Sequence, residues 1–199
     1  MSQTIEYFFA PQSPWTYLGH QRLQDIAAAT GARIEVRPAD YGRIFPASGG
    51  LPLPKRAPQR QAYRLVELAR FSQHLGVPLN LHPRHFPVPA DDAARLIVAV
   101  REQAGDAAAL ALAGAVLRAV WVQERDIAAA DTMAALLAEQ GLDAGLLAQS
   151  RTAATQQAYD ANTDRALALG VFGAPTYAVG EELFWGQDRL DFLQRRLAG

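Results

Sequence analysis

Strand-like segments occur only near the two ends of this chain. In the segments between them, apolar residues recur at the spacing of helices. Residues 4–10 are rich in aromatic and β-branched types and stop at a proline, which is typical of a short strand. Residues 32–40 alternate apolar and charged positions, which predicts a second strand. Two more short strands are expected at 176–179 and 183–185, on either side of a turn at Gly180. Such a chain must bring its ends together to complete one sheet.

A helix is predicted between the first two strands. Ser13 suits the cap at its amino end, Pro14 suits its first position and Gly31 suits its end. A strand, a helix of this length and a second strand form a parallel βαβ unit with a right-handed crossover.

The middle of the chain is expected to be helical. Residues 41–58 are dense in glycine and proline, which predicts an irregular loop that borders a functional site. Helical spacing then recurs, often with alanine-rich turns, at 59–75, 91–104, 106–124, 131–140, 144–150 and 155–169. The prediction is therefore an α/β chain with the element order of a thioredoxin-like fold. Residues 1–40 and 155–199 would form its βαβ…ββα sheet domain, and residues 41–154 would form the loop and an all-helical insertion domain.

Cysteine is absent from all 199 residues. This excludes disulfides, cysteine nucleophiles, thiolate metal sites and redox chemistry on the protein's own sulfur. The net charge of −1 provides no general attraction for nucleic acid, so no nucleic-acid partner is expected. No apolar run is expected to approach the ~20 residues of a membrane-spanning helix, and the first residues lack a secretory pattern. We therefore expect a cytoplasmic protein without a membrane partner.

Ser13 lies where the first strand gives way to the first helix, at the ligand-binding edge of open α/β sheets. A serine before a proline at a helix start is most often a plain cap. The spacing Ser13-x-x-Thr16, however, has the form of a Cys-x-x-Cys redox pair with oxygen in place of both sulfurs. The positive end of the helix also stabilises an anion beside the hydroxyl.

Pro175 directly precedes the third predicted strand. A proline at such a place is usually a trans residue at a strand start. In thioredoxin-like folds it is characteristically cis and faces the start of the first helix.

Two terminal motifs carry a resemblance to a known family. FFAPQSPWTYLG at 8–19 and VFGAPTYAVGEELFWGQDRLDFL at 171–193 resemble 2-hydroxychromene-2-carboxylate isomerases and, more broadly, kappa-class glutathione transferases. The likeness covers essentially the full chain. Between the motifs it consists mainly of ELARF at 67–71, GVPL at 76–79, FP at 86–87 and AVW at 119–121.

The resemblance implies a glutathione-dependent enzyme in which a serine replaces the redox cysteine and glutathione supplies the sulfur. Ser13 would be the catalytic residue and would donate its hydroxyl to the glutathione thiolate. Backbone groups of Ala174, beside Pro175, would pair with the cysteinyl main chain of glutathione. The N–H groups of Gln187 and Asp188, at the start of the last helix, would receive the γ-glutamyl carboxylate, and the Asp188 carboxylate would bind its ammonium. Without the family, a plain N-cap is an equal alternative for Asp188.

The long loop departs from the family pattern. Gly50 and Leu51 stand where relatives often have Gly-Asn, and Arg60 stands where relatives often have a lysine before a tyrosine. Arg60 keeps the charge, whereas Leu51 cannot make the hydrogen bonds of an amide. Lys55 is a further cation for a carboxylate of the cofactor or the substrate, although a basic loop residue is usually a solvated surface feature. The loop leaves substrate choice and glutathione affinity open.

Three aromatic residues, Phe9, Trp15 and Phe86, are expected walls of a substrate pocket, with core packing as the alternative for each. His82 and His85 lack a paired carboxylate or cysteine motif, so no metal site is expected.

The sequence is compatible with three functions. The first is a glutathione-dependent isomerase of the 2-hydroxychromene-2-carboxylate type, which performs a cis–trans isomerisation of a small aromatic carboxylate in aromatic compound degradation through a transient glutathione adduct. The second is a kappa-like glutathione transferase or peroxidase that acts on small electrophiles through the same serine. The third is a redox-silent thioredoxin-like binding module. An apolar helical surface would favour a homodimer.

Overall fold

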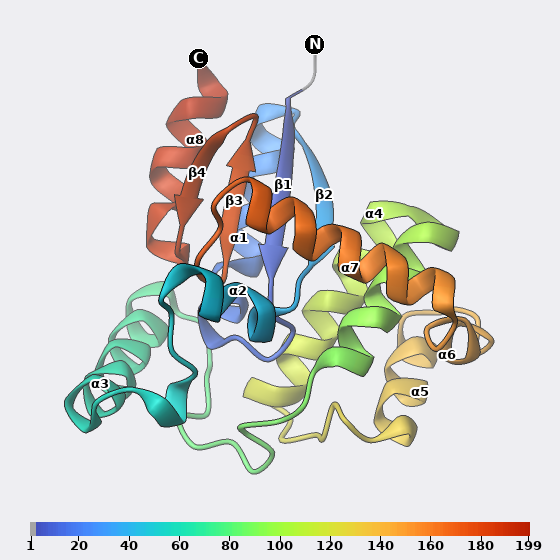
Figure 1. Cartoon of the computed structure of the whole chain (residues 1–199). Coiled ribbons are helices and arrows are strands. Elements are labelled where there is room, and N and C mark those ends of the chain that lie inside the picture. Colours follow the sequence, from blue (N-terminus) through green and yellow to red (C-terminus); the bar gives the residue numbers. More distant parts are fainter. Residues whose placement is uncertain (1–2) are drawn as a thin grey trace.

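The computed structural model describes residues 3–199 and contains a four-stranded mixed sheet with the strand order β2-β1-β3-β4 (Figure 1). Strand β1 pairs parallel with β2 and antiparallel with β3, and β3 pairs antiparallel with β4. The strands are β1 (Thr4–Phe9), β2 (Arg33–Pro38), β3 (Thr176–Val179) and β4 (Glu182–Trp185). The sheet joins the two ends of the chain, which confirms the predicted α/β class and thioredoxin-like order.

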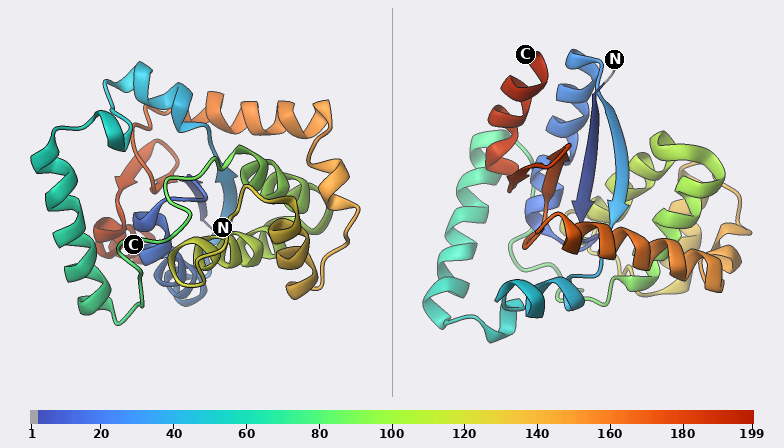
Figure 2. Two further views of the ribbon diagram at one scale, coloured as in Figure 1. Left: turned by 90° about the horizontal axis from the view of Figure 1, so that it is seen from below. Right: turned by 45° about the horizontal axis from the view of Figure 1, so that its top comes forward.

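Helices cover both faces of this sheet. Helices α1 and α8 lie on one face, and α7 crosses the other (Figures 1 and 2). The helices and 3-10 turns are α1 (Pro14–Thr30), α2 (Tyr41–Ser48), η1 (Leu53–Lys55), α3 (Pro58–Leu75), α4 (Asp91–Trp121), α5 (Ala130–Glu139), α6 (Leu146–Gln149), α7 (Ala153–Ala168), η2 (Gln187–Arg189) and α8 (Leu190–Ala198).

Strand β1 is buried on both faces, which explains its almost continuous apolar sequence. Tyr7 and Phe9 belong to the core that the sheet shares with α1 and α4. Phe8 points the other way, into a second cluster with α2 and α7. Glu6 is the exception on that face, and its carboxylate pairs with Arg165 of α7 at 2.7 Å. A buried charge of this kind is retained because it is paired.

Helix α4 is the central helix of the inserted segment. It bends at Gly105, whose φ of 85° separates the two predicted helices 91–104 and 106–124. By length and composition α4 is apolar enough to cross a membrane, and 61% of its most apolar window is buried inside the structure. The expectation that no apolar run approaches such a length is wrong for this segment, because alanine-rich turns also count as apolar. This degree of burial of α4 is typical of a helix in the core of a protein.

The sheet and the inserted helices share one core. Its buried side chains include Tyr7 of β1, Leu23 of α1 and Trp121 of α4. Both proposed parts of the chain contribute to this cluster, so the division into residues 1–40 with 155–199 and residues 41–154 stays a prediction.

Residues 41–58 contain a helix that the sequence does not predict. Helix α2 starts after Asp40, whose side chain accepts a hydrogen bond from an N–H of the first turn at 2.7 Å. It ends at Gly49, which has a φ of 73°. Pro46 lies in its last turn, where the missing N–H removes only one helical hydrogen bond. The glycine and proline residues of this segment therefore mark the end of a short helix as well as a loop.

Candidate functional site

The carboxyl end of β1, the amino end of α1 and the start of β3 meet at one edge of the sheet, at the lower side of Figure 1. Across the sheet, Phe8 of β1 pairs with Thr176 of β3, and Thr176 pairs with Trp185 of β4. The residues that follow Phe8 and Trp185 and those that precede Thr176 therefore lie beyond the same edge. This register brings the three predicted segments of a glutathione site to one end of the molecule.

Ser13 caps α1, as predicted. Its Oγ accepts a hydrogen bond from the Thr16 N–H at 3.2 Å, and its main-chain oxygen accepts one from the Tyr17 N–H at 3.0 Å. The side chain is half-buried, and within residues 3–199 its hydroxyl donates to no other group. The hydrogen of the hydroxyl is therefore available to a ligand at the positive end of the helix.

No general base accompanies Ser13 in the described part of the chain. The histidine of α1, His20, is buried, with Nδ1 3.2 Å from the Tyr7 hydroxyl and Nε2 3.1 Å from the Leu110 oxygen. Burial lowers the pKa of His20 to about 4, so the imidazole is neutral and held by structural hydrogen bonds. A serine without a base is a weak nucleophile. The Ser13 hydroxyl is thus suited to donate a hydrogen bond to an anion.

Pro175 stands directly before β3, and its peptide bond with Ala174 is cis. The Pro175 oxygen accepts a hydrogen bond from the Gly186 N–H at 2.8 Å, which ties the end of β4 to this edge. Ala174 is half-buried, and across residues 3–199 its N–H and C=O have no hydrogen-bond partner. An extended peptide beside Ala174 would find one donor and one acceptor there.

Gln187 and Asp188 lie in the 3-10 turn η2 and not in the last α-helix, which begins at Leu190. Gln187 is buried, and Arg22 of α1 donates to both its main-chain oxygen and its Oε1, each at 3.2 Å. Asp188 is exposed and pairs with Arg189 at 2.8 Å. Neither η2 nor α8 has a side-chain cap, so the plain N-cap interpretation of Asp188 is wrong.

The three expected pocket walls lie in different surroundings. Phe9 is a core residue, because its ring is fully buried and stacks on Tyr7 with centroids 4.5 Å apart. Trp15 is half-buried and meets Phe71 of α3 edge-on at 5.9 Å. Phe86 lines a cavity.

This cavity has a volume of about 330 Å³ and opens between α3 and the segment that leads from α3 to α4. Its volume is at the lower end of the range for ligand pockets, which begins at about 300 Å³. It is lined by Leu53, Gln61, Ala62, Arg64, Leu65, Leu81, His82, Pro83, Phe86 and Pro87. Ser13 is not among the lining residues, so the cavity and the start of α1 are two separate parts of the candidate site.

The loop cations predicted for the site lie outside this cavity. Lys55 and Arg60 are exposed, and their side chains form no hydrogen bond or ion pair with any residue that the structure describes. Arg64, which the sequence did not single out, does line the cavity. Arg60 and Arg64 are four residues apart on α3 and therefore share a face, which is the signal that could have found Arg64.

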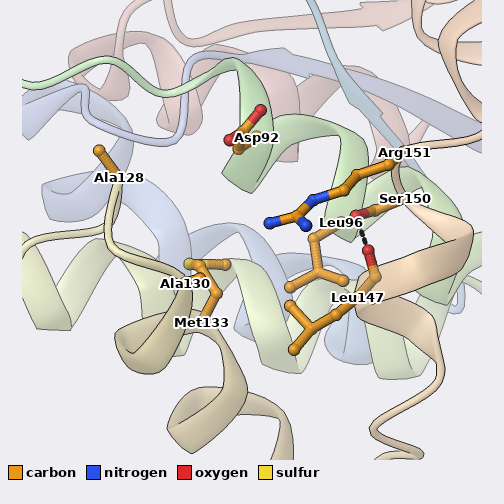
Figure 3. A pocket seen from close by; sticks show the side chains of 8 residues that line it. All are labelled: Asp92, Leu96, Ala128, Ala130, Met133, Leu147, Ser150 and Arg151. Carbon is orange, nitrogen blue, oxygen red and sulfur yellow. Dashed lines mark hydrogen bonds between the residues drawn. The ribbon is translucent and has the colours of Figure 1, made fainter.

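A second cavity lies between α4, α5 and α6, on the side of the molecule opposite α3 (Figures 1 and 3). Figure 3 shows the Arg151 side chain extending into it between Asp92 and Met133. Its volume of about 30 Å³ has room for only about two water molecules, so it is no substrate site. Within residues 3–199, no three histidine, aspartate or glutamate side chains come together as metal ligands.

Comparisons with known proteins agree with this fold. The family model of the DSBA-like thioredoxin domain matches residues 4–198. The 2-hydroxychromene-2-carboxylate isomerase of Sphingobium xenophagum is 32% identical over 199 residues, which cover 99% of each chain. Glutathione S-transferase kappa 1 of Homo sapiens is 24% identical over 209 residues, which cover 99% of this chain and 92% of the human protein.

A solved structure of a 2-hydroxychromene-2-carboxylate isomerase superposes on this chain with a TM-score of 0.80 at 27% identity. The superposition covers 98% of this chain and 94% of that chain. The chain therefore belongs to the DSBA-like thioredoxin family, in its group of 2-hydroxychromene-2-carboxylate isomerases and kappa-class glutathione transferases.

Proposed function

We propose that this protein is a glutathione-dependent isomerase that acts on 2-hydroxychromene-2-carboxylate or a related aromatic degradation acid. A full-length relative at 32% identity is named for this reaction, and a second relative is named for glutathione. One observation carries the proposal: the chain has no cysteine, yet the start of α1 holds the half-buried hydroxyl of Ser13 with its hydrogen free. Sulfur chemistry at such a site requires a thiol from a ligand.

The residues at this edge fit reduced glutathione. The Ser13 hydroxyl and the positive end of α1 suit a thiolate. The unpaired N–H and C=O of Ala174 suit a peptide main chain that binds as an added strand. The exposed Asp188 carboxylate suits the ammonium of the γ-glutamyl group.

Bound glutathione would supply a nucleophilic thiolate that adds to the conjugated, ring-opened acid and leaves after rotation about the former double bond. A free thiol has a pKa of about 8.5 and is mostly protonated at neutral pH. A hydrogen bond from Ser13 and the dipole of α1 both favour the charged form, so they raise the reactive fraction. The same hydrogen bond stabilises the anion each time it is released.

Product analysis tests this proposal. Purified protein, reduced glutathione and 2-hydroxychromene-2-carboxylate are incubated, and both the isomerised acid and free glutathione are measured. An isomerase converts the acid and leaves the amount of glutathione unchanged. Conversion at the same rate without glutathione would contradict the proposal.

The second candidate function is a kappa-like glutathione transferase or peroxidase that acts on small electrophiles. The name of the human relative favours it, and Ser13 would serve in the same way. Product analysis separates the two functions, because a transferase consumes one glutathione for each product. The cytoplasmic location and the homodimer stay predictions.

A further inference from the structure

Arg64 lines the larger cavity without a charged partner. Its guanidinium carbon lies 5.3 Å from the centroid of the Phe86 ring and 5.9 Å from that of the Trp121 ring. The residue is half-buried, and within residues 3–199 its side chain forms no hydrogen bond or ion pair. Glu67, the one acidic residue of α3, pairs with Arg70 at 2.7 Å instead. The guanidinium is held in place by two aromatic rings and leaves its N–H groups unused.

Two further arginines add positive charge around Arg64. Burial, and after it the charge of Arg56, lowers the pKa of Arg64 to about 10. Burial and the charge of Arg60 also lower the pKa of Arg56, whose Nε donates only to the main-chain oxygen of Leu51 at 2.8 Å. None of the three arginines has a carboxylate partner among the described residues. Such an arrangement is unfavourable until an anion binds, because like charges repel and partly buried charges need a counterion.

The other walls of the cavity are largely apolar. Phe86, Leu65 and Leu81 line it together with Arg64. A guanidinium presents a planar pair of N–H donors, which matches the two oxygens of a carboxylate. Aromatic and aliphatic walls match a ring, and the volume of about 330 Å³ admits one small molecule. The cavity thus combines the two recognition features of an aromatic acid.

We propose that this cavity binds a small aromatic carboxylate and that Arg64 binds its carboxylate group. The evidence for this binding site is the cavity itself and the absence of a carboxylate partner for Arg64, Arg56 and Arg60 among the described residues. Only the identification of the bound acid with the isomerase substrate rests on the proposed function. Glutathione also ends in a carboxylate. The apolar walls beside Arg64 favour the acid that carries a ring.

Titration calorimetry of the full chain with cinnamate, in the absence of glutathione, tests the proposal. Wild type should bind cinnamate and should not bind cinnamamide, its neutral counterpart of the same shape. Arg64→Gln should weaken cinnamate binding by about tenfold or more, since a charged hydrogen-bonding pair is lost. Arg64→Lys should keep part of the affinity for cinnamate that Arg64→Gln loses. Arg70→Gln is the matched control on the same helix, because Arg70 is exposed and already paired with Glu67.

Equal affinity of wild type and Arg64→Gln for cinnamate would overturn the proposal, as would equal affinity of wild type for the acid and the amide. Because Arg64 also covers two aromatic rings, Arg64→Met keeps the apolar contact and serves if the glutamine variant does not fold. A second titration uses reduced glutathione. A variant at Arg64 that loses only glutathione binding would assign the arginine to glutathione and overturn the proposal.

The outcome is distinguishable from a failure of the proposed function. A protein that binds cinnamate through Arg64 but has no affinity for glutathione would support the aromatic acid site and contradict the isomerase.

Discussion

The Oγ of Ser13 lies 3.2 Å from the amide nitrogen of Thr16. This hydrogen bond uses a lone pair of the serine to close the amino end of α1 and leaves the hydroxyl hydrogen for a ligand. Thr16 is fully buried, and its Oγ1 has no hydrogen-bond partner among the described residues. Two hydroxyls at the spacing of a redox pair cannot form a disulfide, so this helix start is suited to hold a sulfur anion and not to exchange disulfides.

Ser13→Ala should lower kcat/KM for the isomerisation by about tenfold or more, because the variant loses a donor to the thiolate. It also loses the helix cap, which should lower the free energy of unfolding by about 1 kcal/mol. Steady-state kinetics and urea unfolding measure the two effects. Ser48→Ala is the control, because the Ser48 hydroxyl donates only to main-chain oxygens of α2, those of Ile44 at 2.9 Å and Phe45 at 3.4 Å. Equal kcat/KM for wild type and Ser13→Ala would remove Ser13 from the mechanism.

Asp188→Asn should weaken glutathione binding by about tenfold, because a neutral amide cannot pair with an ammonium as a carboxylate does. The side chain is exposed and caps no helix, so the fold should be unaffected. Calorimetric titration with reduced glutathione gives the Kd. Arg189→Gln frees Asp188 from its ion pair and should leave the affinity equal or raise it. An unchanged Kd in Asp188→Asn would place the ammonium elsewhere.

Gly19→Ala should destabilise the contact of α1 with β3 and η2. A Cβ at Gly19 would lie 2.7 Å from the Tyr177 hydroxyl oxygen and 2.8 Å from the Gln187 Cβ, and both residues are buried. Overpacking of this kind should lower the free energy of unfolding by about 1–3 kcal/mol in urea titrations. Gln21→Ala, at an exposed position of the same helix, should change it by less than about 0.5 kcal/mol. A Gly19→Ala protein as stable as wild type would show that the helix can move away without loss.

His20 should make the protein less stable in acid. Burial lowers its pKa from the ordinary value of 6.5 to about 4, so between these values the unfolded chain binds a proton that the folded chain does not. Neutral His20 therefore makes its full contribution to the free energy of unfolding above pH 6.5, and this contribution is lost as the pH falls towards 4. The loss should reach about 3 kcal/mol.

The variant His20→Gln has no such titration. The free energies of unfolding of wild type and His20→Gln should therefore become more similar as the pH falls. Urea unfolding at several pH values measures both free energies. A stability curve of His20→Gln as steep as that of wild type would assign the pH dependence to other groups.

The sheet and α1 could be predicted because several local signals agree. Ser13 and Pro14 mark the start of α1, and Gly31, with a φ of 68°, marks its end. Helix α2 was missed because its local signals oppose it: Pro46 and Gly49 indicate a loop. Its stability comes from tertiary packing, since Ile44 is fully buried in the cluster with α7.

The start of the site could be predicted from the sequence, and the cavity could not. Ser13 is placed by its own neighbours in the chain. Arg64 faces a cavity only because residues 81–87 return against α3, and this long-range contact leaves no local pattern in the sequence. The burial of Phe9 has a similar cause, because it shares a face of β1 with Tyr7 and that face is covered by distant helices.

The central claim is that Ser13 and the start of α1 stabilise the thiolate of bound glutathione. The ultraviolet absorbance of the thiolate, followed against pH with saturating protein, measures the pKa of the bound thiol directly. We predict a pKa below the ~8.5 of a free thiol in wild type and a return towards that value in Ser13→Ala. A bound thiol with the same pKa in both proteins would contradict the claim.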